Sequence, residues 1–314
     1  MRSIKSIIRN SFKKVLPLQK ISYWLRRVRD FVSIVNIRLI LKIFLRREMV
    51  LKLYNQGLAG RLFTFATTSV ACKERKWRMK LIWIKNYLCG CDFSDLFDND
   101  IERANDDAAT GFDDFVSFAP RFLTMDKHIF YSDLFFTKFN NALPGLHGLC
   151  VLNREAREAI HFELNLLRPK KIIENKLLSF PPNTIGVHIR MTDSSWKKFI
   201  NYDWFDKRME QLIKENDQIV FFLATDCAVT RDKYLKKFPN KILYYESELA
   251  GLTDSVSCRR GTIDGAQQAL LDLLTLSRTS RILGTYGSTF GWLASLWGDI
   301  PIEFNVPEKL TTDI

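Results

Sequence analysis

The sequence predicts an α/β protein of two domains, and three observations support this prediction. The chain has 314 residues, a length typical of two domains that each bury a core. Hydrophobic residues make up 46% of it and charged residues 26%, which is typical of a globular protein and excludes a disordered, collagen-like or polytopic membrane chain. In its second half, short apolar runs alternate with helical patterns, as in a parallel sheet covered on both faces.

The first half contains a pattern typical of a βαβ unit. Its elements are, in order, a strand at 49–54, a glycine-containing turn at Asn55–Arg61, a helix to about Cys72 and a strand at 79–84. Residues 86–150 are acidic and aromatic with weak periodicity, and the aspartate-rich run 106–114 predicts a loop. Helices interrupted at Pro169 are expected over 154–178.

The second half is more regular. Apolar, β-rich runs predict strands at 185–189, 219–223, 242–245, 282–286 and 300–304. Helical patterns between them predict helices at 204–214, 229–238, 263–276 and 290–297. The break at Pro181–Asn183 is the expected boundary between a domain at 48–180 and a domain at 181–314. Ligands of such tandem α/β domains bind in the cleft at the carboxyl ends of the strands.

The net charge of +12 belongs to an N-terminal arm at 1–47. This arm holds thirteen lysines and arginines and one acid, Asp30, whereas the rest of the chain is neutral. Apolar residues recur in it at helical spacing between the cations, a pattern that suits an amphipathic helix on an anionic membrane. A helix packed on the protein's own body would have the same composition. A nucleic-acid partner is not expected, because the body is neutral and has no binding motif.

The cysteines and histidines predict neither a metal site nor a disulfide framework. Only Cys89 and Cys91 of the six cysteines are close in sequence, and their spacing differs from that of a zinc knuckle or a redox pair. No segment has the roughly 18–20 uninterrupted apolar residues of a membrane span, and lysines interrupt every candidate signal peptide. We therefore expect a cytoplasmic protein, peripheral at the inner face of the cytoplasmic membrane.

Two clusters of polar residues follow predicted strands in the second half. His188 and Arg190 share a face of the strand at 185–189 by alternation, and Asp193 follows shortly after. The Arg190 guanidinium is suited to bidentate binding of a phosphate, although an ion pair with an aspartate is the structural alternative. The second cluster is the sequence Ala-Thr-Asp that ends at Asp226.

Two further clusters belong to helices. Asp272 lies inside a leucine-rich helix, where a carboxylate is costly to bury unless a group such as a guanine edge donates hydrogen bonds to it. The alternative places Asp272 on the polar helix face with Gln268. The turn Gly284–Phe290 includes Ser288 and Thr289, whose hydroxyls and backbone N–H groups at a helix N-terminus suit an anion, or simply cap the helix.

In this order, the clusters resemble those of the GDP-fucose-dependent fucosyltransferases. The shared features are His-x-Arg-x-Thr-Asp at 188–193, the strand before Asp226, and an acid, Asp272, sixteen residues before Ser288. The α-1,6-fucosyltransferases of nodulation-factor and N-glycan-core type are most similar, and protein O-fucosyltransferases less so. The turn Gly57–Leu62 is similar to the loop that opens their acceptor-side domain. The resemblance covers 49–85 and 155–304.

The resemblance implies a GT-B-like fold of two Rossmann-like domains facing across a cleft, preceded here by the basic helical arm. It implies an inverting glycosyltransferase that needs no cofactor or metal. Arg190 would grip the β-phosphate, His188 and Asp272 would contact guanine, and Asp226 would lie near the nucleoside. The remaining donor-binding residues that it implies are Ser288 and Thr289, with Gly57, Ala59, Gly60 and Arg61 of the N-terminal turn.

The sequence departs from the family pattern at several of these positions. Met191 stands where many relatives have a second arginine, and Cys227 replaces an acid. The N-terminal turn reads Gly-Leu-Ala-Gly and lacks the family's asparagine. Lys198 occupies the position of a carboxylate that core-fucosylating relatives have, so the general base is expected to be Asp193. Alternatives for the base are Asp95, Asp98 and the acids of 106–114.

The expected function is transfer of fucose from GDP-fucose to a glycan acceptor, such as a surface polysaccharide, a lipopolysaccharide or a lipid-linked oligosaccharide. Two alternatives stay open at this point. One is the same fold with a different nucleotide-sugar donor. The other is a catalytically silent protein that binds a glycan or a nucleotide.

Overall fold

In a computed structural model of the chain, the described residues are 48–54, 56–104, 154–191, 201–246 and 260–305. The expected arm at 1–47 and the expected loop at 106–114 lie outside these residues. The first sheet pairs β1 (Glu48–Leu53) with β2 (Arg78–Trp83) in parallel, joined by α4 (Leu58–Arg75). The predicted βαβ unit is confirmed. Buried leucines of both strands, such as Leu51 and Leu81, pack against this helix.

The second sheet has five parallel strands in the order β5-β4-β3-β6-β7. These strands are β3 (Ile185–Ile189), β4 (Phe221–Thr225), β5 (Ile242–Leu243), β6 (Ile282–Gly284) and β7 (Ile302–Phe304). On one side of the sheet the strands that follow β3 in sequence, β4 and then β5, lie progressively further out. On the other side β6 pairs with β3, and β7 lies beyond β6. The carboxyl ends of β3 and β6 therefore flank the point where the order reverses, which is where open α/β sheets bind their ligands.

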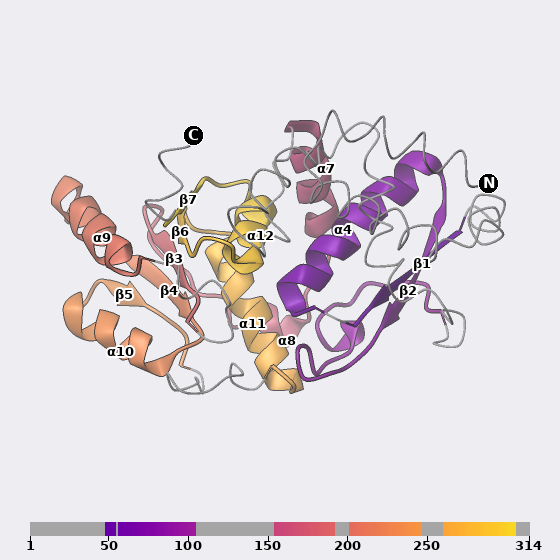
Figure 1. Cartoon of the computed structure of the whole chain (residues 1–314), viewed down its shortest axis with the longest axis horizontal. Helices are drawn as coiled ribbons and strands as arrows, with labels where there is room; N and C mark the ends of the chain where they lie inside the picture. Colours follow the sequence, from indigo (N-terminus) through magenta and orange to yellow (C-terminus); the bar gives the residue numbers. More distant parts are fainter. Residues whose placement is uncertain (1–47, 55, 105–153, 192–200, 247–259, 306–314) are drawn as a thin grey trace, which may run out of the picture.

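Helices cover both faces of this sheet (Figure 1). On one face, α9 (Asp203–Glu215) and α10 (Ala228–Lys237) pack against Val187, Phe221 and their neighbours. On the other, α11 (Ile263–Leu276) and α12 (Thr289–Gly298) pack against Phe222 and Ala224. Alternate residues of one strand thus reach opposite cores, which explains why the strands read as continuous apolar runs.

A continuous hydrophobic core joins the two sheets. Both α11 and α12 contact α4, and the rings of Phe63 and Trp292 meet edge to face with centroids 4.8 Å apart. The short η1 (Phe93–Asp95), α7 (Arg154–Asn165) and α8 (Lys171–Glu174) contribute buried residues to the same core. The structure is thus α/β with parallel sheets, as predicted, while the GT-B-like two-domain arrangement and its boundary at 181 stay predictions.

Most predicted elements lie within two residues of the observed ones. The strand that begins at Ile242 is shorter than predicted and ends at Leu243. Its apolar run continues to Tyr245, but that side chain leaves the sheet edge, because its hydroxyl accepts the Leu178 N–H at 2.9 Å and contacts Thr275 Oγ1 at 2.8 Å. Within the described part of the chain, the helices are too short or too polar to span a bilayer.

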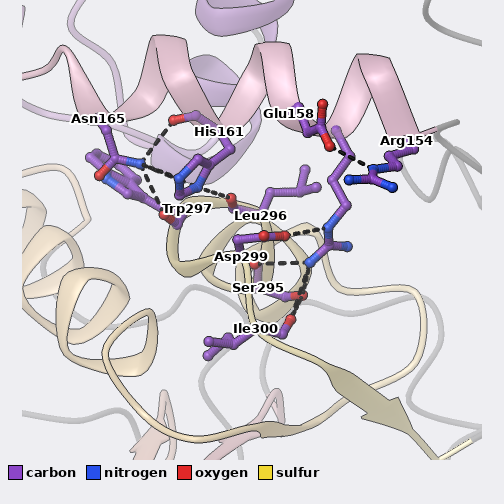
Figure 2. A network of polar contacts seen from close by, with 10 residues as sticks. Arg154, Glu158, His161, Asn165, Ser295, Leu296, Trp297, Asp299 and Ile300 are labelled. Carbon is purple, nitrogen blue, oxygen red and sulfur yellow. Dashed lines mark hydrogen bonds and ion pairs between the residues drawn. The ribbon is translucent and has the colours of Figure 1, made fainter.

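The helix α7 binds the C-terminal end of α12 through polar side chains (Figure 2). Asn165 donates to the Trp297 carbonyl at 3.1 Å, and the His161 ring lies 3.2 Å from the Leu296 carbonyl. The Arg157 guanidinium donates to the Asp299 carboxylate at 2.9 Å and to the Ser295 and Ile300 carbonyls at 3.3 and 3.2 Å. These groups add side-chain donors at the end of α12, where the backbone N–H groups of Asp299 and Ile300 also bond the last carbonyls.

We expect Arg157→Ala to lower the free energy of unfolding by about 1–3 kcal/mol, because it removes charged donors from half-buried acceptors. Denaturant titration of the variant measures this change. Arg154→Ala is the matched control, since Arg154 is on the same helix, is 90% exposed and pairs only with the exposed Glu158 in the described contacts. It should change stability by less than about 0.5 kcal/mol. Equal effects of the two variants would contradict this interpretation of the interface.

Candidate functional site

Thr285 ties the carboxyl end of β6 to that of β3. Its backbone N–H and its hydroxyl both donate to the His188 carbonyl at 3.0 Å. The same hydroxyl accepts the Arg190 N–H at 2.9 Å. Because Thr285 is fully buried, these bonds fix the backbone of Arg190 at the point where the strand order reverses.

Arg190 and Asp226 form an ion pair across two neighbouring strands. Ile189 and Thr225 are register partners in β3 and β4, so the residues that follow them come out side by side. Arg190 Nη1 lies 2.8 Å from Asp226 Oδ2, and Asp226 Oδ1 accepts the Met191 N–H at 2.8 Å. The ion pair that the sequence left as an alternative is present, and it orients the guanidinium at the edge of the sheet.

Tyr202 lies beside this pair and donates its hydroxyl to the Arg190 carbonyl at 3.0 Å. Burial, and then the nearby Asp226 charge, raises the pKa of Tyr202 to about 12. The phenol therefore keeps its proton at neutral pH and remains a donor that holds the backbone of Arg190.

His188 is buried and neutral. Its ring stacks on Phe290 with centroids 5.1 Å apart, and a Cβ added to Gly291 would lie 3.2 Å from His188 Nδ1. Burial, with a further contribution from the Arg190 charge, lowers the pKa of His188 to about 3. Among the described residues, Nδ1 has no hydrogen-bond partner although it is buried. An orphaned buried nitrogen is unusual and is consistent with a ligand-binding role.

The N-terminus of α12 follows β6 directly and has no capping side chain. Ser288 is the N-cap residue, yet its hydroxyl makes no cap hydrogen bond, and the first turn contains no acid. Gly287 has a φ of 77°, a conformation that favours glycine, and the Asn305 side chain accepts the Tyr286 N–H at 2.7 Å. The plain Ser/Thr cap considered for this turn is therefore absent at Ser288, and Ser288 and Thr289 are both half-buried residues.

The N-terminus of α4 has the same two properties. Its N-cap residue is Gly57, no side chain caps it, and its first turn has no acid. The early residues of the two helices meet through the contact between Phe63 and Trp292. The N-terminal halves of α4 and α12 are thus in contact, and the N-terminus of each helix is a region of partial positive charge.

Arg61 lies in the first turn of α4 but is fully buried. Its guanidinium donates to three backbone carbonyls and to the Asn86 side chain, over distances of 2.7–3.2 Å. Arg61 therefore fixes the turn after β1 against the turn after β2. Ala59 in the same turn is also buried. A Cβ added to Gly60 would lie 3.2 Å from Gln56 Cβ, a tight contact. A Cβ added to Gly57 would meet only the Leu88 carbonyl, at 3.9 Å.

Asp272 lies on α11. Gln268 donates to Asp272 Oδ1 at 3.1 Å, as expected for two residues on one helix face. Burial nevertheless raises the pKa of Asp272 to about 7. The carboxyl group has no cation beside it in the described contacts, so it is ready to accept donors from a ligand.

This pKa predicts a pH-dependent stability. Between the ordinary value of 3.8 and about 7, the folded chain binds more protons at Asp272 than the unfolded chain, so stability falls as pH rises through this window. Asp272→Asn should remove this dependence. We expect the variant to melt above the wild type at pH values above 7 and the difference to vanish as the pH approaches 4. Melting curves across this range measure it, and a constant difference would contradict the prediction.

The general base stays a prediction, because Asp193 lies outside the described residues. Two alternatives are described and form ion pairs on the surface: Asp95 with Lys85, and Asp98 with Lys170. Within the described ranges, no group of three His, Cys, Asp or Glu residues is arranged to hold a metal ion.

The sequence interpretation missed two groups at this edge of the sheet. One is Thr285, which it included in the turn without assigning a role. The other is Arg260, whose guanidinium Nη2 lies 3.9 Å from Asp226 Oδ2. Arg260 begins a stretch, through Ser288 and Thr289, that resembles bacterial glycosyltransferases of this group, but the sequence interpretation gave it no role.

Comparisons with known proteins give matches at the level of structure. No family model matches the sequence, and no curated protein matches it. A crystal structure of NodZ α-1,6-fucosyltransferase soaked with GDP-fucose matches with a TM-score of 0.52 at 16% identity, over 84% of this chain and 97% of that one. Fucosyltransferase NodZ from Bradyrhizobium matches with a TM-score of 0.51 at 15% identity, over the same shares.

A mutant of Arabidopsis thaliana FUT1 in complex with GDP matches with a TM-score of 0.50 at 12% identity, over 83% of this chain and 71% of that one. At such identities a structural likeness shows the fold. The resemblance expected from the sequence motifs is thus confirmed for the fold: this chain has a fold similar to that of the NodZ and FUT1 structures.

Proposed function

We propose that this chain is a glycosyltransferase that transfers fucose from GDP-fucose to a glycan acceptor. The observation that carries this proposal is the oriented Arg190 guanidinium at the carboxyl edge of the five-stranded sheet, beside the uncapped N-terminus of α12. The shared fold supports it, because the matching NodZ structure was soaked with GDP-fucose and the matching FUT1 structure contains GDP.

In this proposal the pyrophosphate binds at the N-termini of α12 and α4. Arg190 grips the β-phosphate, and the hydroxyls of Ser288 and Thr289 donate to phosphate oxygens. Backbone N–H groups at Gly57–Gly60 add donors from the other helix, and Arg61 holds that turn in place. Helix N-termini without acids favour an anion through both their free N–H groups and their dipoles.

The guanine base is proposed to bind His188 and Asp272, with Asp226 near the nucleoside. An ionised Asp272 can accept the ring N–H and the amino group of guanine together, a pair of donors that adenine does not offer. Neutral His188 has a buried nitrogen for a further hydrogen bond. The raised pKa of Asp272 fits this role, since a buried carboxylate that accepts from Gln268 gains two further donors from the base.

The proposed reaction is an inverting displacement without a metal cofactor. The acceptor hydroxyl oxygen bonds to C1 of fucose while the bond from C1 to the phosphate oxygen breaks, and its electron pair stays on GDP. Asp193 takes the proton of the acceptor hydroxyl. Arg190 and the helix N-termini stabilise the negative charge that develops on the leaving GDP, which is the task that a metal ion performs in other enzymes.

A thermal-shift panel of GDP, UDP, ADP, CMP and GDP-fucose, without metal, tests the donor. A ligand that binds only the folded protein raises its melting temperature. Selective stabilisation by GDP and GDP-fucose is expected. A preference for UDP would support the same fold with another donor and would contradict the fucosyltransferase assignment, as would the absence of any shift with GDP.

The acceptor is proposed to be a surface-polysaccharide, lipopolysaccharide or lipid-linked precursor, met at the inner face of the cytoplasmic membrane. The basic, amphipathic sequence of residues 1–47 motivates this part of the proposal. Deletion of 1–47 should abolish co-sedimentation with vesicles that contain anionic lipid. Unchanged co-sedimentation of the deletion variant would overturn the membrane part and leave the donor assignment intact.

A further inference from the structure

Two buried cysteines meet in the turn that follows β2. Cys89 Sγ lies 3.7 Å from Cys91 Sγ, and the two residues are 1% and 0% exposed. Only Gly90 separates them in the chain. Their spacing did not predict a redox pair, but the structure brings both sulfurs together. The two atoms need to move less than about 2 Å closer to form an S–S bond of about 2.05 Å.

The two thiols differ in acidity. The hydrogen bond from Cys91 lowers the pKa of the Cys89 thiol to about 7; burial opposes this shift, and the charge of Arg61 adds to it. The same hydrogen bond, together with burial, raises the pKa of Cys91, which keeps its proton. Because the thiolate is the reactive form of cysteine, Cys89 is suited to attack an oxidant and Cys91 to react in the second step.

The turn lies at the surface although its sulfurs do not. Leu88, Gly90 and Asp92, which flank the two cysteines, are half-buried, and Tyr87 is exposed. The sulfurs thus lie just beneath a partly exposed backbone, where an oxidant as small as hydrogen peroxide can reach them.

The Cys89–Cys91 pair is linked to the turn before α4 through two polar side chains. Asn86 and Cys89 exchange backbone hydrogen bonds of 3.1 Å. Asn86 Oδ1 accepts the Cys89 N–H and Arg61 Nη2, both at 3.1 Å. Arg61 in turn donates to the Gln56 carbonyl at 2.8 Å. A displacement of Cys89 therefore alters the contacts that hold the N-terminus of α4.

The segment before α11 packs closely against the same turn. The Gly90 N–H donates to the Arg260 carbonyl at 2.8 Å, and a Cβ added to Gly90 would lie 1.9 Å from the Gly261 carbonyl carbon. On the other side, Trp83 Nε1 donates to the Cys91 carbonyl at 2.8 Å. Backbone packed this closely cannot tighten around a new S–S bond without shifting its neighbours.

We propose that the Cys89–Cys91 pair is a redox switch: hydrogen peroxide converts it to a disulfide, and the disulfide weakens ligand binding at the N-terminus of α4. Formation of the disulfide does not depend on the proposed function. Its effect on GDP rests on the proposed function and deepens it, because backbone N–H groups at Gly57–Gly60 are the proposed donors to the pyrophosphate.

The reaction consumes one peroxide molecule and two thiols. The Cys89 sulfur attacks one oxygen, the O–O bond breaks, and hydroxide leaves and takes up the thiol proton as water. Cys89 is then a sulfenic acid. The Cys91 sulfur attacks the Cys89 sulfur, the S–O bond breaks, and a second water leaves with the Cys91 proton. Two electrons pass from the sulfurs to peroxide, and dithiothreitol returns them by thiol–disulfide exchange.

Peptide mass spectrometry of the full chain, treated with hydrogen peroxide and then alkylated, tests the disulfide. The peptide that contains both cysteines should lose two hydrogens and resist alkylation, and dithiothreitol should reverse both changes. Cys72→Ala is the matched control, since Cys72 is also buried, at 2% exposure, and its loss should leave the disulfide intact. A peptide that is fully alkylated after peroxide would overturn the inference and leave the proposed function untouched.

Calorimetric titration of GDP into the reduced and the oxidised protein tests the switch. We expect GDP to bind at least about 5-fold more weakly to the oxidised wild type, and dithiothreitol to restore the affinity. The double variant Cys89→Ala with Cys91→Ala should bind GDP equally before and after peroxide. The corresponding double serine variant serves in its place if the alanine variant does not fold.

Equal GDP affinity of the oxidised and the reduced wild type would overturn the switch. An equal loss of affinity in the double variant would do the same, because the effect would then come from oxidation elsewhere in the chain. A reduced wild type that does not bind GDP would overturn the proposed function and the effect on GDP with it, whereas the disulfide is judged by its own peptide.

Discussion

Arg190→Ala is expected to weaken GDP binding about 30- to 1000-fold, the largest effect of any single substitution in the proposed site. The substitution removes the guanidinium that is proposed to grip the β-phosphate. It also takes from Asp226 its 2.8 Å partner, so less positive charge offsets this carboxylate beside the proposed pyrophosphate site. Both consequences act against an anionic ligand, and calorimetric titration of GDP into the folded variant measures their sum.

The double variant Arg190→Ala with Asp226→Asn separates the two consequences. It removes the repulsive charge and should recover part of the affinity, but not that of the wild type. Arg208→Ala is the control, because Arg208 is also 21% exposed and pairs with a carboxylate, Glu303, elsewhere on the sheet. If Arg190→Ala bound GDP as tightly as the wild type, the pyrophosphate would not bind at this edge.

Gly298→Ala is expected to give the largest loss of stability. A Cβ at Gly298, the last residue of α12, would lie 1.8 Å from the carbonyl oxygen of Ser277, the C-cap residue of α11. The clash is with backbone, so no side-chain rotation relieves it. The ends of two central helices must therefore separate. We expect the free energy of unfolding to fall by about 3 kcal/mol. Denaturant titration measures this loss as a lower midpoint.

Gly57→Ala provides the control for this prediction. Its Cβ would meet only the Leu88 carbonyl at 3.9 Å, an ordinary van der Waals distance, and its φ of −70° suits alanine. The free energy of unfolding of this variant should therefore lie within about 1 kcal/mol of the wild-type value. A Gly298→Ala variant as stable as Gly57→Ala would show that α11 and α12 do not meet as described.

Much of the fold could be predicted because each element has a local signal. The helix at 263–276 matches its prediction at both ends, since Thr262 caps it by accepting the Gly265 N–H and an uninterrupted apolar stripe fills it. The strand at 185–189 also matches, because all five residues are buried between two helical layers. Buried parallel strands and amphipathic helices are the patterns that a single sequence shows best.

The candidate site could be predicted only in part, because its contacts join distant segments. Arg190 and Asp226 were recognisable as strand-end residues, but their pairing depends on the register of β3 against β4. The burial of Arg61 depends on four acceptors from two turns that are about 30 residues apart in sequence, which no local pattern specifies. Arg260 lies near Asp226 and its backbone contacts the distant turn at Gly90, and neither contact has a local sequence signal.

The central claim is that this edge of the sheet binds and activates a GDP-sugar donor, and release of GDP from GDP-fucose tests it most directly. We predict that the wild type releases GDP slowly by hydrolysis without an acceptor and without added metal, and that Arg190→Ala does so at least about 100-fold more slowly. A wild type that binds GDP-fucose but releases no more GDP than Arg190→Ala would contradict the enzyme assignment and favour a silent nucleotide-binding protein.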